Sequence, residues 1–453
     1  MSELVCPLDF RYGREEMKAV FSEESKLSLL LAVEAALARA HAKVGNIPRE
    51  DADEITRKAT TGYVKVERVK EIESEIRHDL MAVVKALSEQ CTESAARWVH
   101  LGATSYDIID TANALQLQTA SQIIMGELRK LNLSVAALAR KHKNTIMLGR
   151  THGQHAVPIT FGLKMAVFAA ETGRQMDRLE EGEKRLAAGK MAGAVGSGAA
   201  LGQKALEIQD IVMTELGLAA EDASTQIVGR DRYIEFLSNL ANIATSVEKF
   251  GTEIRNLQRN EILEAAESFN VKKQVGSSTM AHKKNPVNCE QVCGMARLVR
   301  AQLLPAWENA IQWHERDLCN SSAERFILPH ACIITDWIIH QMANVFENLA
   351  VYPDRMKENL ERSLGLPMAE SVMMKLTEKG MGRQDAHELV RKCSMIAATD
   401  RINLAEVLKG DAGVMVVMGA AEIDAAMNPE NYAGSSAEIV ERVISKLEKR
   451  KQL

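Results

Sequence analysis

Aromatic residues and prolines are scarce in this sequence. Phe, Trp and Tyr make up 4% of its 453 residues, and nine residues are proline. Strand-rich sandwiches and barrels favour β-branched and aromatic residues and need many turns, so this composition argues against them. Two intervals without proline, residues 49–157 and 159–285, leave room for long helices instead.

An excess of positive charge and long apolar runs are also missing. With 56 basic and 61 acidic side chains the formal net charge is −5, which argues against a nucleic-acid binder. No uncharged stretch reaches the ~18 residues of a membrane-spanning helix. The first ten residues, which include Glu3 and Asp9, lack the basic and apolar regions of a signal peptide. We therefore expect a cytoplasmic protein that binds neither membranes nor nucleic acid.

Cysteines do not form the dense framework of a small disulfide-bonded protein. They are odd in number and scattered along the chain, and we expect reduced thiols at Cys6, Cys91, Cys289, Cys293, Cys319, Cys332 and Cys393. Cys289 and Cys293 lie four residues apart on a predicted helix. Two thiols without further ligands indicate packing residues rather than a metal site.

Apolar residues recur at helical spacing in two long segments. Leu117, Ile124, Leu131 and Leu138 stand seven residues apart, and a second series runs through positions 236–257 in alternating steps of four and three. Such stripes are typical of helices that pack in a bundle. The fold class that we predict is all-α, with a central bundle of long helices.

Breaks in helical periodicity suggest three domains. The first stripe begins after Asp110, and periodicity is interrupted around Pro353. We predict an N-terminal helical domain (residues 1–110), a central long-helix bundle with a functional loop (residues 111–352) and a C-terminal helical domain (residues 353–453). The tail, residues 437–453, has the pattern of a solvated terminal helix.

Residues 276–286, GSSTMAHKKNP, contain the most informative pattern. Two serines after a glycine are followed by three cationic residues, which could stabilise a serine alkoxide or an anionic substrate group. Asn285 and Pro286 form an N-cap and first-turn pair that predicts the start of a helix. A polar surface loop is the alternative interpretation.

A second motif, GRTHGQH at residues 149–155, contains two histidines. His152 and His155 stand three residues apart, but no third ligand lies at a useful spacing, so we discount a metal site. A histidine in a turn can act as general acid or base if a carboxylate orients it. A histidine satisfied by hydrogen bonds within the fold remains the alternative.

Several further clusters combine arginine with hydroxyl or imidazole donors, a combination that binds phosphate or carboxylate. Taken singly, each is equally compatible with surface salt bridges or turns. The glycines at positions 193, 196, 198 and 202 lack a preceding strand and a phosphate-binding lysine. They indicate a turn between helices rather than a nucleotide loop.

Taken in order, these segments resemble the fumarase/aspartase superfamily of lyases, whose signature loop GSSxMPxKxN reads GSSTMAHKKNP here. Within it the chain resembles the adenylosuccinate lyase family. The motifs that carry this resemblance are RYGREEM near the start, IRHDL at 76–80, HLGATSYDIIDTA at 100–112, GRTHGQHAVPITFG at 149–162, STQIVGRDR at 224–232 and WHERDLCNSSAER at 313–325. Two positions depart from the family pattern: Ala281 replaces the usual proline, and Tyr233 a histidine that is frequent in bacterial relatives.

The resemblance implies catalytic roles at five positions. Ser277 would be the general base that removes a proton from the succinyl Cβ, and His152 the general acid that protonates the departing nitrogen. Glu290 would orient His152. Lys283 and Asn285 would bind the carboxylate whose charge grows in the carbanion-like intermediate.

The resemblance also implies a substrate-binding set, a fold and an assembly. The substrate-binding residues would be Arg11, Tyr12, Arg77, His78, Asp79, Thr104, Ser105, Gln226, Arg316, Ser321 and Arg325. The family fold has a small helical N-terminal domain, a central bundle and a small helical C-terminal domain. Family members form homotetramers in which each active site draws motifs from three subunits, and they need neither metal nor cofactor.

The activity implied is cofactor-independent elimination of fumarate from adenylosuccinate, giving AMP, and from succinylaminoimidazole carboxamide ribotide in purine nucleotide biosynthesis. A 3-carboxymuconate cycloisomerase acts on a nucleotide-free substrate and gives no reason for the donors at Arg11 and Arg77. Argininosuccinate lyase usually has glutamine where His282 stands. A non-catalytic structural protein on this fold would have no need to retain all five catalytic residues.

Overall fold

The computed structural model describes residues 5–268, 279–280 and 282–453. Within these residues the chain is mainly helical, and the predicted all-α class is confirmed. The helices before the first long helix are α1 (Pro7–Phe10), α2 (Glu15–Val20), α3 (Glu23–Lys43), α4 (Arg49–Lys58), α5 (Val66–Ile76), α6 (Asp79–Ser88) and α7 (Glu93–Ala96).

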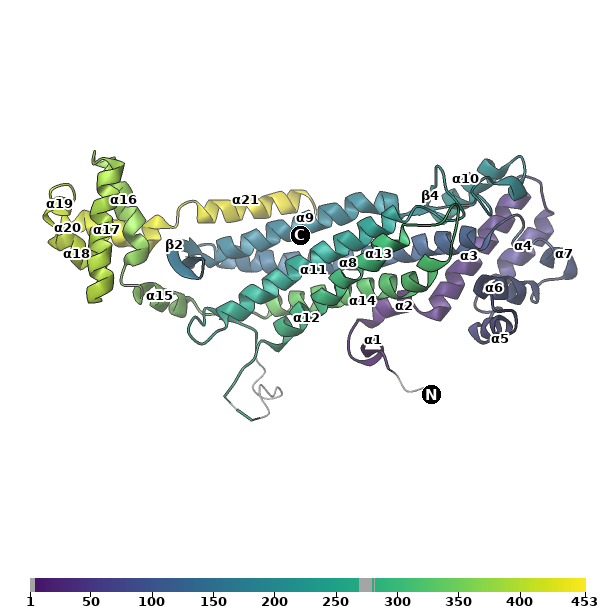
Figure 1. Cartoon of the computed structure of the whole chain (residues 1–453), viewed down its shortest axis with the longest axis horizontal. Helices are drawn as coiled ribbons and strands as arrows, with labels where there is room; N and C mark the ends of the chain where they lie inside the picture. The colour runs from purple at the N-terminus through teal and green to yellow at the C-terminus, as the bar shows by residue number, and fades with distance from the viewer. Residues whose placement is uncertain (1–4, 269–278, 281) are drawn as a thin grey trace. The chain divides into compact units, whose positions relative to one another are not determined.

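Long helices carry both predicted apolar stripes. They are α8 (Ser105–Lys141), α9 (Phe161–Leu186), α11 (Asp231–Leu257) and α14 (Cys319–Glu347), visible as the long ribbons of Figure 1. On α8 the side chains of Leu117, Ile124 and Leu131 are at most 1% exposed, and the stripe on α11 is at most 3% exposed. The heptad-like spacing therefore predicted buried helix faces correctly.

Shorter elements connect and follow these helices. The remaining α-helices are α10 (Ala205–Leu216), α12 (Val287–Ala301), α13 (Leu303–Asn309), α15 (Pro353–Glu361), α16 (Ala369–Glu378), α17 (Arg383–Asp400), α18 (Leu404–Gly410), α19 (Ala412–Met415), α20 (Ala420–Met427) and α21 (Ser436–Lys449). Single 3-10 turns occupy Ala199–Leu201, Leu366–Met368 and Pro429–Tyr432. The strands are β1 (Ile146–Thr151), β2 (Gln154–Thr160), β3 (Ala188–Gly189), β4 (Ala219–Ala220), β5 (Ala265–Ala266) and β6 (Ala350–Val351).

Contacts divide the described chain into two compact units. The first unit consists of the described parts of residues 1–128, 175–245 and 294–339, and the second of residues 129–174, 246–293 and 340–453. Each long helix contributes residues to both units. The division into three domains at residues 110 and 352 remains a prediction.

The core of the first unit forms where α3 packs against α4, α6 and α10. Helix α3 begins at Ser22, whose hydroxyl accepts the Ser25 N–H at 3.2 Å and so satisfies one free donor of the first turn. Its inner face buries Leu31 and Leu37 against Ile55 and other apolar side chains. This packing fixes the positions of α5 and α6, which bear several predicted site residues.

The glycine-rich segment after β3 forms a turn, as predicted. Gly193, Gly196 and Gly198 all have positive φ angles, which glycine adopts at little cost. Gly196 lies so close to the Ser224 carbonyl that a Cβ would overlap it. The buried Asp107 carboxylate accepts the Gly193 N–H at 3.0 Å, which ties this turn to the start of α8.

In the second unit, α16, α17, α18 and α20 pack around a small apolar core that includes Val372, Leu376, Leu404 and Ile423. Figure 1 shows this group in yellow-green. The predicted terminal helix is confirmed as α21, which buries one face and keeps a charged outer face. Strands β1 and β2 form an antiparallel hairpin that composition alone did not predict.

None of the helices in the described part of the chain is long and apolar enough to span a membrane. All seven cysteines are free of disulfide bonds. Cys289 and Cys293 are buried on one face of α12, which confirms that they are packing residues.

Candidate active site

The predicted site residues fall into two groups, one in each unit. The first unit holds the predicted substrate-binding residues Arg11, Tyr12, Arg77, His78, Asp79, Thr104, Ser105, Gln226, Arg316, Ser321 and Arg325. The second unit holds His152, Lys283, Asn285 and Glu290. Ser277 lies outside the described residues, as does Ala281.

His152 stands at the tip of the β1–β2 hairpin. Thr151 pairs with Gln154, so His152 and Gly153 form a two-residue loop. Their φ angles are 54° and 74°, and a type I′ loop requires positive φ at both positions. Glycine adopts this conformation readily, whereas histidine is strained in it. The loop leaves the imidazole exposed, where it can reach a ligand.

Lys283 and Asn285 lie directly before α12. The Pro286 carbonyl accepts the Glu290 N–H at 3.0 Å and α12 begins at Val287, so the helix starts one residue later than the Asn-Pro pair predicts, with Pro286 in the N-cap position. Glu290 is exposed in the first turn. Lys283 and Asn285 therefore stand directly before the first turn of this helix.

Glu267 supports this helix start, and sequence reasoning missed it. Its carboxylate accepts the backbone N–H groups of Asn288 at 3.2 Å and Cys289 at 2.6 Å, which satisfies donors that the first helical turn leaves free. The Gln258 side chain also donates to the Lys284 carbonyl at 3.0 Å. Both contacts fix the segment that carries Lys283 and Asn285.

A cavity of about 360 Å³ adjoins Glu290. Three cationic side chains, Arg255, Arg259 and Lys284, line it together with this single carboxylate. Among the described residues no hydrogen bond joins Glu290 to His152, so the orienting role of Glu290 remains a prediction from the family resemblance. The charge of the cavity nevertheless suits an anionic ligand.

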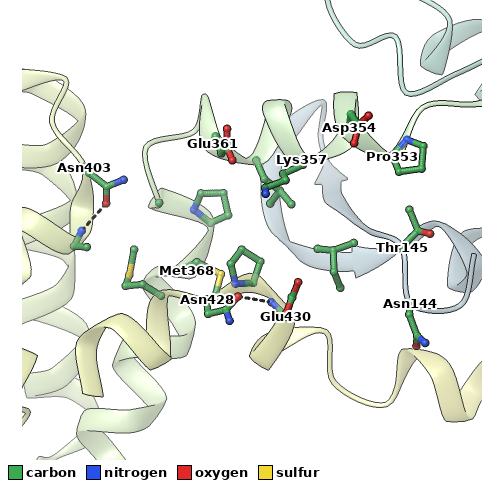
Figure 2. Close-up of a pocket in the computed structure, with 17 residues that line it drawn as sticks. Asn144, Thr145, Pro353, Asp354, Lys357, Glu361, Met368, Asn403, Asn428 and Glu430 are labelled. Atoms are coloured by element: carbon green, nitrogen blue, oxygen red, sulfur yellow. Dashed lines mark hydrogen bonds between the residues drawn. The ribbon is translucent and has the colours of Figure 1, made fainter. Parts of the chain in front are cut away.

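A second cavity in this unit, of about 700 Å³, is unsuited to an anionic substrate (Figure 2). None of the predicted site residues lines it, and its charged side chains are the carboxylates of Asp354, Glu361 and Glu430 and the ammonium of Lys357. The Asn428 side chain accepts the Glu430 N–H at 3.1 Å, so it serves as a helix cap. The predicted chemistry therefore does not belong to this larger cavity.

In the first unit, Asp79 and Arg325 come together from α6 and α14. An Arg325 guanidinium nitrogen donates to the Asp79 carboxylate at 2.5 Å. Burial works to raise the pKa of Asp79, but the Leu80 N–H and the Arg325 guanidinium outweigh it and lower that pKa. Asp79 therefore holds Arg325 at the protein surface as an ionised partner.

The neighbouring Arg77 and His78 shape the turn between α5 and α6. Arg77 ends α5 with a φ of 54°, a left-handed conformation that costs energy for a residue other than glycine. His78 caps α6, because its Nδ1 accepts the Met81 N–H at 3.3 Å. This leaves Nε2 to carry the ring proton and to donate to a ligand, which agrees with the predicted binding role.

Tyr106 brings two further predicted residues together. Its hydroxyl donates to the Ser321 Oγ at 3.0 Å, and its ring lies 3.9 Å from the Arg316 guanidinium carbon. One nitrogen of Arg316 is buried and has no hydrogen-bond partner in the part of the chain that the structure describes. Since a buried donor without an acceptor is costly, this nitrogen is suited to an incoming anionic group.

Gln226 is held by the loop before α11. Its backbone N–H donates to the Glu315 carbonyl at 3.3 Å, and its side chain donates to the Ala194 carbonyl at 3.0 Å. These contacts place Gln226 beside the segment that contains Arg316. The structure thus brings Gln226, Arg316 and Ser321 into one region of the first unit.

A buried network around Arg230 supports that region and was missed from the sequence. Arg230 is 4% exposed, and it donates to Asp110 at 2.7 and 3.0 Å and to Glu324 at 2.9 and 3.1 Å. It joins α8, the loop that holds Gln226, and α14. In the sequence, Arg230 stands out only as part of the STQIVGRDR motif. The motif does not reveal its two carboxylate partners, which lie about 100 positions away.

Arg11 and Tyr12 remain next to each other at the end of α1. The Arg11 Nε donates to the Tyr12 hydroxyl at 3.2 Å, and the Tyr12 ring meets Trp337 edge to face at 5.2 Å. Arg14 fixes the same segment, since it donates to the buried Asp336 carboxylate at 2.7 Å and pairs with Glu127 at 3.0 Å. This anchor was also missed from the sequence.

Comparison with protein families accounts for most of the chain. A family model described as "Lyase" matches residues 9–301, and one described as "Adenylosuccinate lyase C-terminus" matches residues 365–443. The adenylosuccinate lyase of Pyrococcus abyssi is 50% identical over 98% of this chain and 98% of its own length. The chain belongs to the adenylosuccinate lyase family. The resemblance inferred from the motifs is thereby confirmed.

Other members of the family match over similar lengths. The adenylosuccinate lyase of Methanothermobacter thermautotrophicus is 47% identical over 98% of this chain and 99% of its own. The enzyme of Synechocystis is 42% identical over 96% of this chain and 99% of its own. The similarity therefore extends through both units rather than being confined to the signature loop.

Solved structures confirm the superfamily fold. A fumarate lyase from Mesorhizobium sp. BNC1 superposes with a TM-score of 0.89 at 33% identity, covering 96% of this chain and 98% of that chain. A 3-carboxy-cis,cis-muconate lactonizing enzyme from Pseudomonas putida gives 0.88 at 32% identity, covering 98% and 99%. Both are less similar to this chain in sequence than the adenylosuccinate lyases named above.

Tyr233, one of the two departures from the family pattern, is 3% exposed and lies beside Arg230. The Arg230 guanidinium carbon lies 5.0 Å from the centre of its ring, and its hydroxyl has no hydrogen-bond partner among the described residues. Tyr233 therefore packs against Arg230 inside the first unit and does not reach the protein surface.

Proposed function

We propose that this chain eliminates fumarate from adenylosuccinate to give AMP, and from succinylaminoimidazole carboxamide ribotide to give the carboxamide ribotide. The observation that carries the proposal is 50% identity to an adenylosuccinate lyase over nearly the whole length of both chains. Family membership makes the protein a carbon–nitrogen lyase. Its place would be in purine nucleotide biosynthesis.

The proposed reaction needs one base and one acid. The Ser277 alkoxide takes the proton from the succinyl Cβ, and the electron pair left behind forms the new double bond of fumarate as the C–N bond breaks. His152 gives its proton to the departing nitrogen. The exposed position of His152 at the hairpin tip supports this role, because a donor must reach the substrate.

Lys283 and Asn285 would bind the carboxylate next to the carbon that loses its proton. Negative charge grows on this carboxylate in the carbanion-like intermediate, so donors fixed there lower the barrier. Their position directly before α12, in a segment that Glu267 and Gln258 hold in place, supports the role.

The other end of the substrate carries a phosphate and would bind the donors of the first unit. Arg11, Arg77, Arg316 and Arg325 supply guanidinium groups, which suit bidentate binding of phosphate. The buried unpartnered nitrogen of Arg316 supports this assignment.

We also propose that the protein is a homotetramer with active sites shared between subunits. An exposed apolar surface on and after α13, formed by Leu304, Trp307 and Ile311 at 61%, 53% and 75% exposure, supports it. Leu304 and Trp307 lie three residues apart on α13, and Ile311 follows just after its end. Large exposed apolar patches mark protein interfaces. In such a tetramer, Glu290 of one subunit would orient His152 of another, which accounts for the lack of a hydrogen bond between them within one chain's described residues.

A cytoplasmic location completes the proposal. Seven free cysteines fit a reducing compartment, and cytoplasmic proteins keep their thiols reduced.

A panel of substrates tests the proposed function. Purified protein is mixed separately with adenylosuccinate, argininosuccinate and 3-carboxymuconate, and products are followed by chromatography. We expect fumarate and AMP from adenylosuccinate and no turnover of the other two compounds. Turnover of 3-carboxymuconate alone would assign the chain to the cycloisomerase reaction, and no turnover of either succinyl nucleotide would refute the proposal.

A further inference from the structure

A small cavity in the first unit lies beside two of the predicted substrate-binding residues. It has a volume of about 170 Å³ and is bounded by α3, α5 and α6, with Arg325 of α14 at its rim. Leu27, Leu30, Leu80 and Val83 form apolar parts of its wall. Such a wall lowers the effective dielectric constant and strengthens any charge interaction at the rim.

Charged groups face this cavity from four helices. They are Glu23 and Lys26 of α3, Lys70 and Glu73 of α5, Asp79 of α6 and Arg325 of α14. Two of the cations are paired, since Lys70 forms an ion pair with Glu23 and Arg325 with Asp79. Lys26 is half-buried and has neither a hydrogen bond nor an ion pair within the described residues.

An unpaired ammonium group at this place carries an energetic cost. Burial lowers the pKa of Lys26, and the positive charge of Arg325 lowers it further, against the smaller opposite effects of Asp79, Glu73 and Glu23. Asp79 already compensates Arg325 at 2.5 Å. Glu73 and the other carboxylates of the cavity attract Lys26 without a direct ion pair among the described residues, so its N–H donors remain open to an oxyanion.

We propose that Lys26 binds an oxyanion of the succinyl nucleotide in this cavity, beside Arg325. The inference rests on the proposed function and adds a donor that none of the motifs assigns. The substrate offers two kinds of oxyanion, the phosphate and the succinyl carboxylates, and both would take a charge-assisted hydrogen bond from the ammonium group.

The matched control for Lys26 is Lys70. It lines the same cavity, but its charge is already paired with Glu23 and its side chain is 57% exposed. Lys26→Met should raise KM for adenylosuccinate by about tenfold or more, because a hydrogen bond to a charged group is lost, and should leave kcat within a few-fold. Lys70→Met should leave both values within about twofold of the wild type.

Lys26→Arg separates binding from a merely structural role. Because the pKa of Lys26 is lowered, its ammonium group loses its charge at a lower pH than an ordinary lysine. In the wild type, KM should therefore rise as the solution becomes alkaline. In Lys26→Arg this alkaline rise should disappear, since a guanidinium keeps its charge, while KM near neutral pH stays near the wild-type value.

Product inhibition identifies which oxyanion Lys26 binds. If it is the phosphate, Lys26→Met weakens inhibition by AMP and leaves inhibition by fumarate unchanged; if it is a carboxylate, the reverse holds. If Lys26→Met is active and keeps the wild-type KM and the wild-type inhibition by both products, the inference about Lys26 is wrong, while the proposed function stands. Absence of turnover in the wild type would overturn the proposed function, and the inference with it.

Discussion

His152 is exposed at a strained hairpin tip, and its proposed role as general acid gives a direct prediction. Replacing it with alanine removes the proton donor for the departing nitrogen. We expect His152→Ala to lower kcat by about 100-fold to 10,000-fold, the usual contribution of general acid catalysis. Steady-state fumarate release measures the effect. Ser277→Ala should lower kcat in the same way because it removes the proposed base.

His155 provides the control on the same hairpin. Its Nδ1 and the Ser363 Oγ lie 2.7 Å apart, and burial together with the Arg150 charge lowers its pKa. We expect His155→Gln to keep kcat within a few-fold. Near-normal kcat in His152→Ala would show that another group protonates the nitrogen.

Asp336 gives a pH-dependent prediction about stability. Burial raises its pKa to about 6, although the Arg14 guanidinium opposes the shift. The folded protein therefore retains a proton between about pH 4 and 6 that the unfolded chain releases, and the free energy of unfolding falls as pH rises through this range. Between pH 4 and 7, the unfolding free energy of the wild type should fall by up to about 3 kcal/mol relative to that of Asp336→Asn.

Urea unfolding at fixed protein concentration and several pH values measures this difference. Asp210→Asn is the control, because it removes an exposed carboxylate. Parallel stability curves for the wild type and Asp336→Asn would mean that folding does not raise the pKa of Asp336.

At the level of residues, the sequence indicated the groups proposed to contact the substrate but not the residues that hold them in place. Short motifs revealed His152 and Arg325 because chemistry restricts the residue types that can serve there. Lys26 and Glu267 have no motif of their own. Their contacts depend on which helices meet in the fold, and an acid or base in a helix looks the same in sequence whether it is buried or exposed.

At the level of elements, Arg230 joins α8 to α14 through its bonds to Asp110 and Glu324. We expect its replacement to cause a large loss of stability. Arg230→Met would leave the carboxylates of Asp110 and Glu324 buried without their partner. We expect a loss of about 3–5 kcal/mol in unfolding free energy, typical of a broken buried ion pair. We also expect a lower kcat/KM, since the loop with Gln226 and the helix with Ser321 lose their common support. Urea unfolding and steady-state kinetics measure the two effects.

The surface pair of Arg185 and Glu235 serves as control. Its side chains are 57% and 36% exposed, so Arg185→Gln should cost less than about 1 kcal/mol. If Arg230→Met and Arg185→Gln lost the same unfolding free energy, burial of the Arg230 ion pairs would not be the cause of the loss.

Among the elements, the long helices were predictable and the hairpin was not. The apolar stripes of α8 and α11 repeat over many turns, so their periodicity stands out against chance. Strands β1 and β2 are short, and their register depends on pairing with each other. The glycine at position 153 indicated a turn but could not reveal which residues pair on either side of it.

For the whole molecule, the exposed apolar surface of Leu304, Trp307 and Ile311 predicts self-association. Leu304→Asp would place a charge in the proposed subunit interface, where its desolvation is costly. We expect this variant to dissociate to smaller species and to lose activity, as measured by light scattering and fumarate release. Val416→Asp is the control, since Val416 is 87% exposed but lies on the second unit.

A tetramer that persists in Leu304→Asp would place the interface elsewhere. The homotetramer is predicted from the sequence only through the family resemblance. Periodicity shows that a helix has an apolar face, but not which chain covers that face. The same limit applies to the proposed orientation of His152 by Glu290, since a partner from another subunit leaves no mark in the sequence of one chain.

The most direct test of the account is a time course with purified protein and adenylosuccinate in the absence of added metal or cofactor. Proton NMR follows the loss of the succinyl signals and the appearance of fumarate and AMP. We predict fumarate and AMP in equal amounts with the wild type, and product formation at least about 100-fold slower with Ser277→Ala. No conversion by the wild type, or equal conversion by both proteins, would contradict the account.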